Sequence, residues 1–252
     1  MFDLTGKVAL VTGGNGGIGL GIARGFVQSG AAVVVAARNR DKIERAVEDL
    51  KSLGGQALGA ECDVNDRSSI KAAIDAGLSE FGGLDIVVNN SGTNRRAPEP
   101  QELSPEDWQL VIDTNLTSVH SVSSLAFPHM KERGGGKIIN IGSMMSIFGS
   151  PYASAYAASK GGVVQYTKSC AVAWMKHNVQ VNAILPGWIR TDMTAAFLEM
   201  YPERYQLIAD RTPAGRWGEP DELAGTAIFL ASKASDFVTG VSIPVDGGYS
   251  VQ

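Results

Sequence analysis

Short apolar runs rich in β-branched residues recur along the chain and are separated by segments with helical spacing. The runs are apolar throughout rather than alternating, which is typical of strands covered on both faces. They lie at Val8–Thr12, Ala32–Ala37, Ala57–Val64, Asp85–Asn90, Lys137–Gly142, Val179–Leu185 and Val241–Gly248. The helical segments lie at Ile18–Gln28, Arg40–Leu53, Ser68–Phe81, Ser104–Met130, Ala155–Lys176 and Asp221–Leu230. This alternation predicts an α/β protein with a doubly wound parallel sheet of about seven strands and helices on both faces.

The expected elements fill the chain without a linker. The 252 residues are 44% hydrophobic, which suffices for one sizeable core, and no internal repeat or low-complexity tract divides them. We therefore expect a single dinucleotide-binding and catalytic domain over residues 1–252. The longest stretch without a strand runs from Thr191 to Pro220, and we expect residues 191–220 to form a lid over the substrate.

Composition argues against several classes of partner. The net charge is −4 and no long basic run occurs, so nothing favours binding to nucleic acid or to an anionic membrane. Two cysteines cannot form a disulfide framework, and the three histidines show no metal-ligand spacing. The first expected strand starts close to Met1, and no apolar run reaches membrane-spanning length. We expect a cytoplasmic protein without a bound metal.

The eight residues TGGNGGIG at positions 12–19 contain five glycines at the point where the first strand passes into a helix. In a doubly wound sheet this turn brings a helix N-terminus to a pyrophosphate, and glycines let the phosphate approach the backbone. Gly14, Gly16 and Gly19 match the pattern G-x-G-x-x-G. The pattern alone also suits a turn that merely packs a strand against a helix, but its position at the first strand favours a dinucleotide.

The end of the second strand indicates which dinucleotide. An acid that would bond the adenosine ribose is expected there, but Ala37 occupies the position and Arg38 follows it. A guanidinium suits a 2′-phosphate through charge-assisted hydrogen bonds. We therefore expect NADP(H), with NAD(H) as the alternative if Arg38 is an ordinary surface arginine.

A second group of polar residues is expected at the same edge of the sheet. Tyr156 and Lys160 stand four residues apart on a helical segment and so project from one face. Ser143 follows the strand that ends at Gly142, at the carboxyl edge where ligands bind in this architecture. A phenol with a pKa near 10 is a poor base at neutral pH. An adjacent ammonium and a positive nicotinamide would lower that pKa, so the group is suited to proton transfer.

The chain resembles the short-chain dehydrogenase/reductase family over essentially its whole length. The motifs that carry the resemblance follow one another in the family's order: TGGNGGIG (12–19), CDV (62–64), NNSG (89–92), DTNL (113–116), IGS (141–143), YAASK (156–160), PGWIRT (186–191) and VDGG (245–248). The resemblance implies a Rossmann fold, and it moves the phosphate-binding glycines to Gly13, Gly17 and Gly19. One departure concerns Gly16, which stands where many NADP-dependent members have a basic residue. Another is Ser91, where alanine is commoner.

The resemblance also implies a role for individual residues. Tyr156 would be the general acid/base, Lys160 would lower its pKa and hold the nicotinamide ribose, Ser143 would bond the reacting oxygen, and Asn115 would steady a proton-relaying water. The implied cofactor-binding residues are Gly13, Asn15, Gly17, Ile18, Gly19, Arg38, Asp63, Val64, Asn89, Ser91, Gly92, Tyr156, Lys160, Pro186, Gly187, Ile189 and Thr191. The family further implies a homotetramer.

The substrate is indicated less directly. The stretches NNSGTNRRAP and RTPAGRWGEP look like those of the gluconate 5-dehydrogenase and deoxygluconate dehydrogenase branch. Arg95 and Arg96 follow the fourth strand at the expected site edge and would hold a substrate carboxylate; alternatively, they face solvent or another subunit. We expect oxidation of a secondary hydroxyl on a sugar acid or polyol, with Met145 and Trp188 also lining the substrate site.

Two alternatives stay open. One is a broad-specificity NADPH-dependent carbonyl or 3-oxoacyl reductase, because Met145 and Trp188 would also suit an apolar ketone. The other is a nucleotide-sensing protein without catalysis. Such proteins usually lack part of the catalytic group, whereas Asn115, Ser143, Tyr156 and Lys160 are all present.

Overall fold

The computed structural model describes the backbone of residues 1–252 and the side chains of all of them except Ala196. Seven parallel strands form one sheet in the order β3-β2-β1-β4-β5-β6-β7, so the predicted fold class is confirmed. The strands are β1 Val8–Thr12, β2 Ala32–Ala37, β3 Gln56–Glu61, β4 Ile86–Asn89, β5 Gly136–Ile141, β6 Val179–Pro186 and β7 Ser242–Val245. β1 and β2 are buried at every position, which explains why their sequences are apolar throughout rather than alternating.

The strand order reverses beside β1. This strand pairs with β2 on one side, where Val8 lies opposite Ala32, and with β4 on the other, where Ala9 lies opposite Ile86. The chain therefore builds the sheet outward in one direction through β3 and then returns to start again with β4. Such a switch leaves a crevice at the carboxyl ends of the central strands, and the site lies there.

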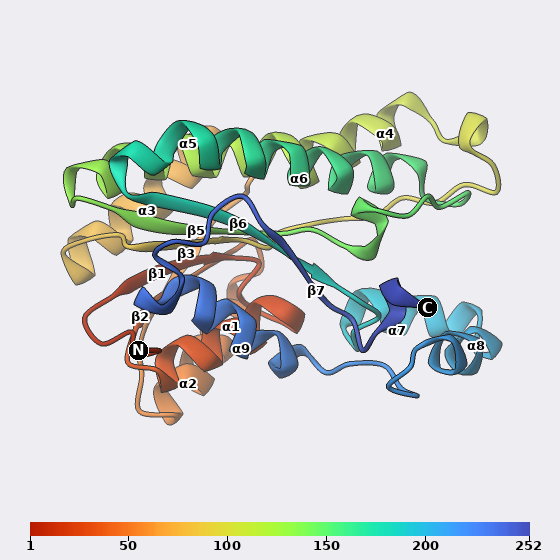
Figure 1. Ribbon diagram of the computed structural model, residues 1–252, viewed down its shortest axis with the longest axis horizontal. Helices are drawn as coiled ribbons and strands as arrows, with labels where there is room; N and C mark the ends of the chain where they lie inside the picture. Colours follow the sequence, from red (N-terminus) through yellow and green to blue (C-terminus); the bar gives the residue numbers. More distant parts are fainter.

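Helices cover both faces of the sheet (Figure 1). α3, α4, α5 and α6 lie on one face, and α1, α2 and α9 lie on the other. α7 and α8 lie apart from both layers, beside the C-terminus of the chain. The helices are α1 Gly17–Gln28, α2 Arg40–Ser52, α3 Arg67–Phe81, α4 Pro105–Ile112, α5 Ser118–Glu132, α6 Ser154–Trp174, α7 Asp192–Met200, α8 Glu203–Arg211 and α9 Ala224–Ala231.

Two regions differ from the sequence-based expectation. The helix expected over Ser104–Met130 is divided into α4 and α5 by a π-helical turn at Asp113–Thr117. The surrounding pattern is helical on both sides of this turn, so spacing alone did not reveal it. The stretch from Thr191 to Pro220 has no strand, as expected, but it contains α7 and α8. α7 starts with Thr191 as its N-cap, whose hydroxyl accepts a hydrogen bond from the backbone of Thr194.

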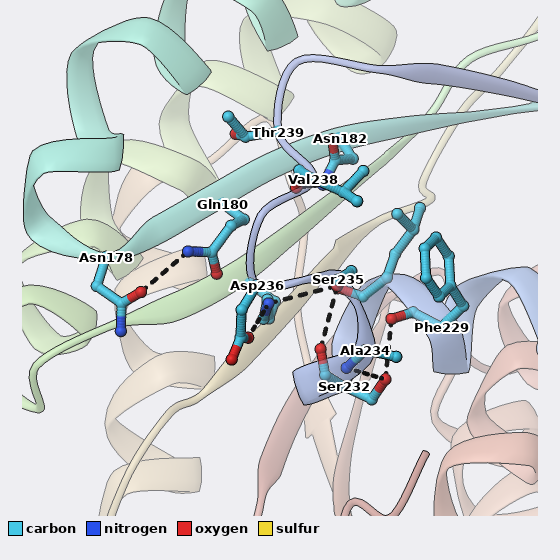
Figure 2. A network of polar contacts seen from close by, with 12 residues as sticks. Asn178, Gln180, Asn182, Phe229, Ser232, Ala234, Ser235, Asp236, Val238 and Thr239 are labelled. Carbon is cyan, nitrogen blue, oxygen red and sulfur yellow. Dashed lines mark hydrogen bonds and ion pairs between the residues drawn. The ribbon is translucent and has the colours of Figure 1, made fainter. Parts of the chain in front are cut away.

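A polar network ties the last part of the chain to the amino ends of β5 and β6 (Figure 2). The Lys137 ammonium donates to Asp236 Oδ1 at 2.8 Å and to Ser235 Oγ at 3.3 Å. The Asn182 side chain donates to the carbonyl of Val238 at 2.9 Å. Lys137 is buried, and burial lowers its pKa. These contacts fix the segment that leads into β7, at the end of the sheet opposite the site.

Candidate active site

The glycine loop between β1 and α1 has the backbone that its sequence requires. Gly13 and Gly17 adopt positive φ values of 64° and 49°, which side chains on other residues disfavour. A Cβ on Gly19 would collide with the carbonyl of Gly13. α1 begins with no side-chain cap and no acid in its first turn, so its first N–H groups and the positive end of its dipole stay free. The loop fits a pyrophosphate.

A cleft of about 760 Å³ opens in front of this loop. Most of the residues expected to bind the cofactor line it: Gly13, Asn15, Gly17, Ile18, Arg38, Asp63, Val64, Ser91, Gly92, Tyr156, Lys160, Pro186, Gly187, Ile189 and Thr191. The cleft therefore runs from the end of β2, past the glycine loop, to Tyr156. It brings together the parts that an extended dinucleotide needs.

Gly19 and Asn89 were also expected in this cleft but do not line it. The amide of Asn89 donates to Ser123 Oγ at 3.0 Å and to Asn140 Oδ1 at 2.8 Å, behind the cleft. Asn90 lines the cleft in its place, and its amide donates to the carbonyls of Thr12 at 3.0 Å and Gly13 at 3.1 Å. Asn89 ends β4 and its side chain points to the helix layer, whereas Asn90 stands just past the strand. The sequence NN did not distinguish the two.

Sequence reasoning also missed Lys42, which lines the cleft from the first turn of α2. Its ammonium pairs with Asp192 Oδ2 at 2.7 Å. One local signal could have found Lys42. It stands four residues after Arg38, in the first turn of the helix that follows the second strand, and so lies near the expected adenosine end of the cleft. Its partner could not be found in this way, because Asp192 lies 150 residues further along the chain.

A second cavity of about 710 Å³ meets the first at Ser143 and Tyr156, which line both. Ser143 caps a short helical turn, and its hydroxyl accepts a hydrogen bond from the backbone of Met145 at 3.1 Å. Tyr156 and Lys160 project from the first turns of α6, as predicted, and Lys160 is buried. A reacting group at this junction can contact a cofactor in one cavity and a substrate in the other.

Burial governs the protonation of these two side chains. It raises the pKa of Tyr156, while a hydrogen bond with Ser143 and the charge of Arg96 act in the opposite direction. The pKa of Tyr156 is therefore raised in the protein by itself, whereas the lowering that we expect involves Lys160 together with a bound nicotinamide. The Lys160 ammonium lies 5.7 Å from the centre of the Tyr156 ring and donates to the carbonyl of Ile141 at 2.7 Å. Burial lowers the pKa of Lys160 to about 8.

Asn115 lies in the π-helical turn between α4 and α5 and is fully buried. Its side-chain oxygen accepts from the backbone N–H of Thr93 at 2.8 Å, and its amide donates to the Thr93 carbonyl at 2.9 Å. The amide also donates to Ser159 Oγ at 3.1 Å, and Ser159 in turn donates to the carbonyl of Tyr156. The turn that interrupts the helix therefore connects Asn115 to the segment carrying Tyr156. Such π-helical turns are frequent at functional sites.

The structure separates the two adjacent arginines expected at the substrate. Arg96 lines the second cavity, and its guanidinium lies 4.3 Å from the centre of the Phe197 ring. The cavity walls partly withdraw it from water, which lowers its pKa. Arg95 does not line this cavity; it pairs with Asp107 Oδ1 at 3.0 Å. Met145 and Trp188 line the cavity as expected.

Helices α7 and α8 add residues that sequence reasoning missed. Arg204 and Arg211 of α8 line the same cavity as Arg96, and Arg211 lies 4.4 Å from the centre of the Tyr249 ring. Within the described part of the chain, no Asp or Glu lines the cavity. Phe197 stacks on Trp188 with ring centres 5.9 Å apart. Phe197 and Tyr201 are four residues apart, a spacing that predicts an apolar helix face. The spacing alone did not indicate that this face would line the second cavity.

Neither a metal centre nor a membrane span occurs among the residues that the structure describes. No group of three or more His, Cys, Asp or Glu side chains is placed there to hold a metal ion. No helix in the same residues is long and apolar enough to cross a membrane.

Comparison with known proteins identifies the family and agrees with the fold. A family model described as enoyl-(acyl carrier protein) reductase matches residues 13–250. The chain belongs to the short-chain dehydrogenase/reductase family, which confirms the resemblance found in the sequence.

Several relatives cover nearly the whole chain. A 2-dehydro-3-deoxy-D-gluconate 5-dehydrogenase of Formosa agariphila is 42% identical over 98% of this chain and 94% of its own length. A 5-keto-D-gluconate 5-reductase of Escherichia coli K12 is 43% identical over 100% of this chain and 98% of its own length. A crystal structure of a gluconate 5-dehydrogenase from Burkholderia cenocepacia, in complex with NADP and tartrate, is 42% identical, covers 100% and 98% of the two chains and has a TM-score of 0.94.

Proposed function

We propose that the protein is an NADP(H)-dependent oxidoreductase that interconverts a secondary alcohol and a ketone on a sugar acid such as gluconate. The observation that carries the substrate class is the charge of the second cavity. Arg96, Arg204 and Arg211 line it, and no carboxylate of the described residues does. Within the described part of the chain, the guanidiniums of Arg96, Arg204 and Arg211 form no hydrogen bond or ion pair with another side chain. A cavity of this kind favours an anion.

The cofactor is proposed from the other cavity. Arg38 stands at the end of β2, where an acid would select NAD(H), and lines the cleft with Lys42. Two cations at this point suit a 2′-phosphate, although the glycine loop supplies none at Gly16. The gluconate 5-dehydrogenase structure that resembles this chain contains NADP. Bound there, the nicotinamide supplies the hydride exchange with the substrate carbon.

The side chains at the junction of the cavities divide the proton chemistry. Tyr156 gives or takes the proton of the reacting oxygen, and Ser143 hydrogen-bonds that oxygen. The raised pKa of Tyr156 keeps the phenol protonated in the free protein, which is the form that donates during reduction. Lys160 holds the ribose of the cofactor and adds positive charge near the phenol. The amide hydrogens of Asn115 are already given to Thr93 and Ser159, so in this proposal Asn115 holds a proton-relaying water near Lys160 through an oxygen atom.

In this proposal the helices of the lid contact the anionic substrate directly. Residues 191–220 carry Phe197, Arg204 and Arg211 against the second cavity, so a bound sugar acid would hold α7 and α8 in place. In this proposal residues 1–252 form one domain. Arg96 binds the substrate carboxylate, while Arg95 stays paired on the protein surface.

We also propose that the protein is cytoplasmic and forms a homotetramer. Sedimentation velocity tests the assembly, and a monomer at assay concentration would contradict it.

The test of the substrate class compares the two neighbouring arginines. Arg96→Gln should lower kcat/KM for gluconate by about 10- to 100-fold, because a charge-assisted hydrogen bond is lost. The matched Arg95→Gln variant should stay within about twofold of the parent. An uncharged polyol should respond to neither change. Cofactor reduction followed at 340 nm measures all three.

The same assay separates the alternatives. Turnover of apolar ketones or 3-oxoacyl thioesters but not of gluconate would favour the carbonyl reductase. NADPH binding without turnover of any alcohol or ketone would favour a nucleotide sensor. Equal effects of both substitutions on gluconate would contradict the role of Arg96.

A further inference from the structure

One ion pair crosses the mouth of the cofactor cleft. Lys42 of α2 stands on the adenosine side, and Asp192 is the first residue of α7 in the lid. Their charged groups are 2.7 Å apart, and both residues line the cleft. The carboxylate side chain is 88% exposed and the lysine side chain 48%. An ion pair this exposed contributes little to stability, so a stronger anion can replace the carboxylate.

The surroundings of Lys42 favour such an anion. Arg38 lines the cleft beside it and makes no side-chain hydrogen bond or ion pair with the described residues. The neighbouring Arg40 is engaged with Glu44 at 3.1 Å. Gly16 faces open space in the glycine loop, where a Cβ would meet no atom within 4 Å. Arg38 and Lys42 are therefore the cations available on this side of the cleft.

The start of α7 also lies close to the glycine loop. A Cβ on Gly17 would be 3.1 Å from Thr191 Cγ2, and Thr191 is the residue before Asp192. The Lys42–Asp192 pair therefore joins the lid to α2 across the cleft that the cofactor enters. A phosphate monoester carries about −1.5 to −2 charges at pH 7, against −1 for a carboxylate. It competes better than Asp192 for the lysine, whereas a ribose hydroxyl does not compete.

We infer that Lys42 is a second reader of the cofactor 2′-phosphate, and that Asp192 on the lid competes with that phosphate for it. This rests on the proposed use of NADP(H). Lys42 replaces the cation that the glycine loop lacks. When the phosphate takes Lys42, Asp192 loses its partner and the start of α7 is released from α2. NAD(H) leaves the ion pair closed, so the lid responds to which cofactor is bound.

The first experiment measures cofactor affinity directly, by isothermal titration calorimetry of the full-length protein with NADPH and NADH. Lys42→Met keeps the aliphatic stem and removes the charge. It should weaken NADPH binding about tenfold and leave NADH binding within about twofold. Thermal unfolding without cofactor checks that each variant is folded.

The second experiment uses the partner of the ion pair. Asp192→Asn frees the lysine and should strengthen NADPH binding by about two- to fivefold, with no effect on NADH. In the Lys42→Met background the same substitution should change NADPH affinity by less than about 1.5-fold, because the competition is gone. A purely structural ion pair would instead give two variants that weaken both cofactors alike.

The outcomes separate this inference from the proposed cofactor. If the parent prefers NADH and Arg38→Ala changes neither affinity, the proposed use of NADP(H) is wrong. If Arg38→Ala weakens NADPH selectively but Lys42→Met does not, only the role of Lys42 is wrong. If Asp192→Asn weakens NADPH binding, or if its effect persists without Lys42, the competition is wrong.

Discussion

At the scale of single residues, the site depends on where neighbouring side chains are directed. Arg96 lies against Phe197 in the substrate cavity, while Arg95 pairs with Asp107 on the surface. Tyr156 lines both cavities, so one hydroxyl can contact substrate and cofactor. The proposed proton chemistry therefore depends on a few atoms at the junction of the two cavities.

The first residue-scale prediction concerns Tyr156. Tyr156→Phe keeps the packing of the ring but removes the proton donor, so kcat should fall by about 10²- to 10⁴-fold. NADPH affinity measured by calorimetry should stay within about threefold of the parent. Turnover within tenfold of the parent would remove Tyr156 from the chemistry.

The second concerns the buried ammonium of Lys160. Its pKa in the folded protein is about 8, below the ordinary value of 10.5, so the unfolded chain binds more protons between these two values. The contribution of Lys160 to stability should therefore rise as pH increases from about 8 towards 10.5. Urea unfolding at pH 7 and pH 10 should show Lys160→Met gaining stability relative to the parent at pH 7 and losing that advantage at pH 10. Lys168→Met, at an exposed position of the same helix, should show no such change; a constant difference for Lys160→Met would contradict the prediction.

At the scale of elements, α7 and α8 form a wall of the second cavity, which we propose takes the substrate. α7 contributes Phe197, whose ring stacks on Trp188 and makes a cation–π contact with the guanidinium of Arg96. α8 contributes Arg204 and Arg211. Trp217 is buried below them and stacks on Tyr205 with ring centres 5.6 Å apart. Helices α7 and α8 thus pack on aromatic rings and present their cations to the cavity.

This arrangement predicts the effect of removing one ring. Phe197→Leu keeps an apolar contact but loses the cation–π interaction, worth about 0.5–1 kcal/mol at an accessible site. The KM for gluconate should rise about two- to fivefold, and NADPH affinity should not change. Phe127→Leu removes a ring of α5 that stacks on Trp174 of α6 and should lower thermal stability without raising the KM. If both variants raised the KM equally, a general loss of packing would explain the result.

At the scale of the whole molecule, the sign of the charge around the second cavity is opposite to the net charge of the chain. The chain carries a net charge of −4, yet arginines and no described carboxylate line the substrate cavity. The topology produces this by bringing the loop after β4 and the helix α8 to the carboxyl edge of the sheet. We therefore expect the cavity to attract an anion despite the sign of the whole protein.

Salt should weaken this attraction. With cofactor saturating, kcat/KM for gluconate should fall several-fold between about 20 and 300 mM NaCl, because the Debye length shortens to well under 10 Å. An uncharged polyol should show little dependence, and Arg96→Gln should flatten the dependence for gluconate. Equal salt dependence for charged and uncharged substrates would show that the cavity charge does not act on the substrate.

Much of this architecture could be predicted from the sequence, because it follows from local patterns. Apolar runs placed the strands, although the run Ala57–Val64 extends past the end of β3 at Glu61. The glycine loop followed from its position after the first strand. Helical spacing placed Tyr156 and Lys160 on one face, and the nearby strand end at Ser143 pointed to the same sheet edge. Arg38 was found from its place at the end of a strand. In each case the information lies within a few residues of the feature that it predicts.

The tertiary structure alone decided the rest, because it depends on contacts between distant segments. It determined that Asn90 and not Asn89 faces the cleft, and that Arg96 and not Arg95 faces the substrate cavity. Adjacent residues of one type carry the same local signal, and only packing directs one inward. It also placed Lys42 against Asp192, which lies 150 residues away. No local pattern reports such a pair, since the folding of the sheet is what brings the two rims of the cleft together.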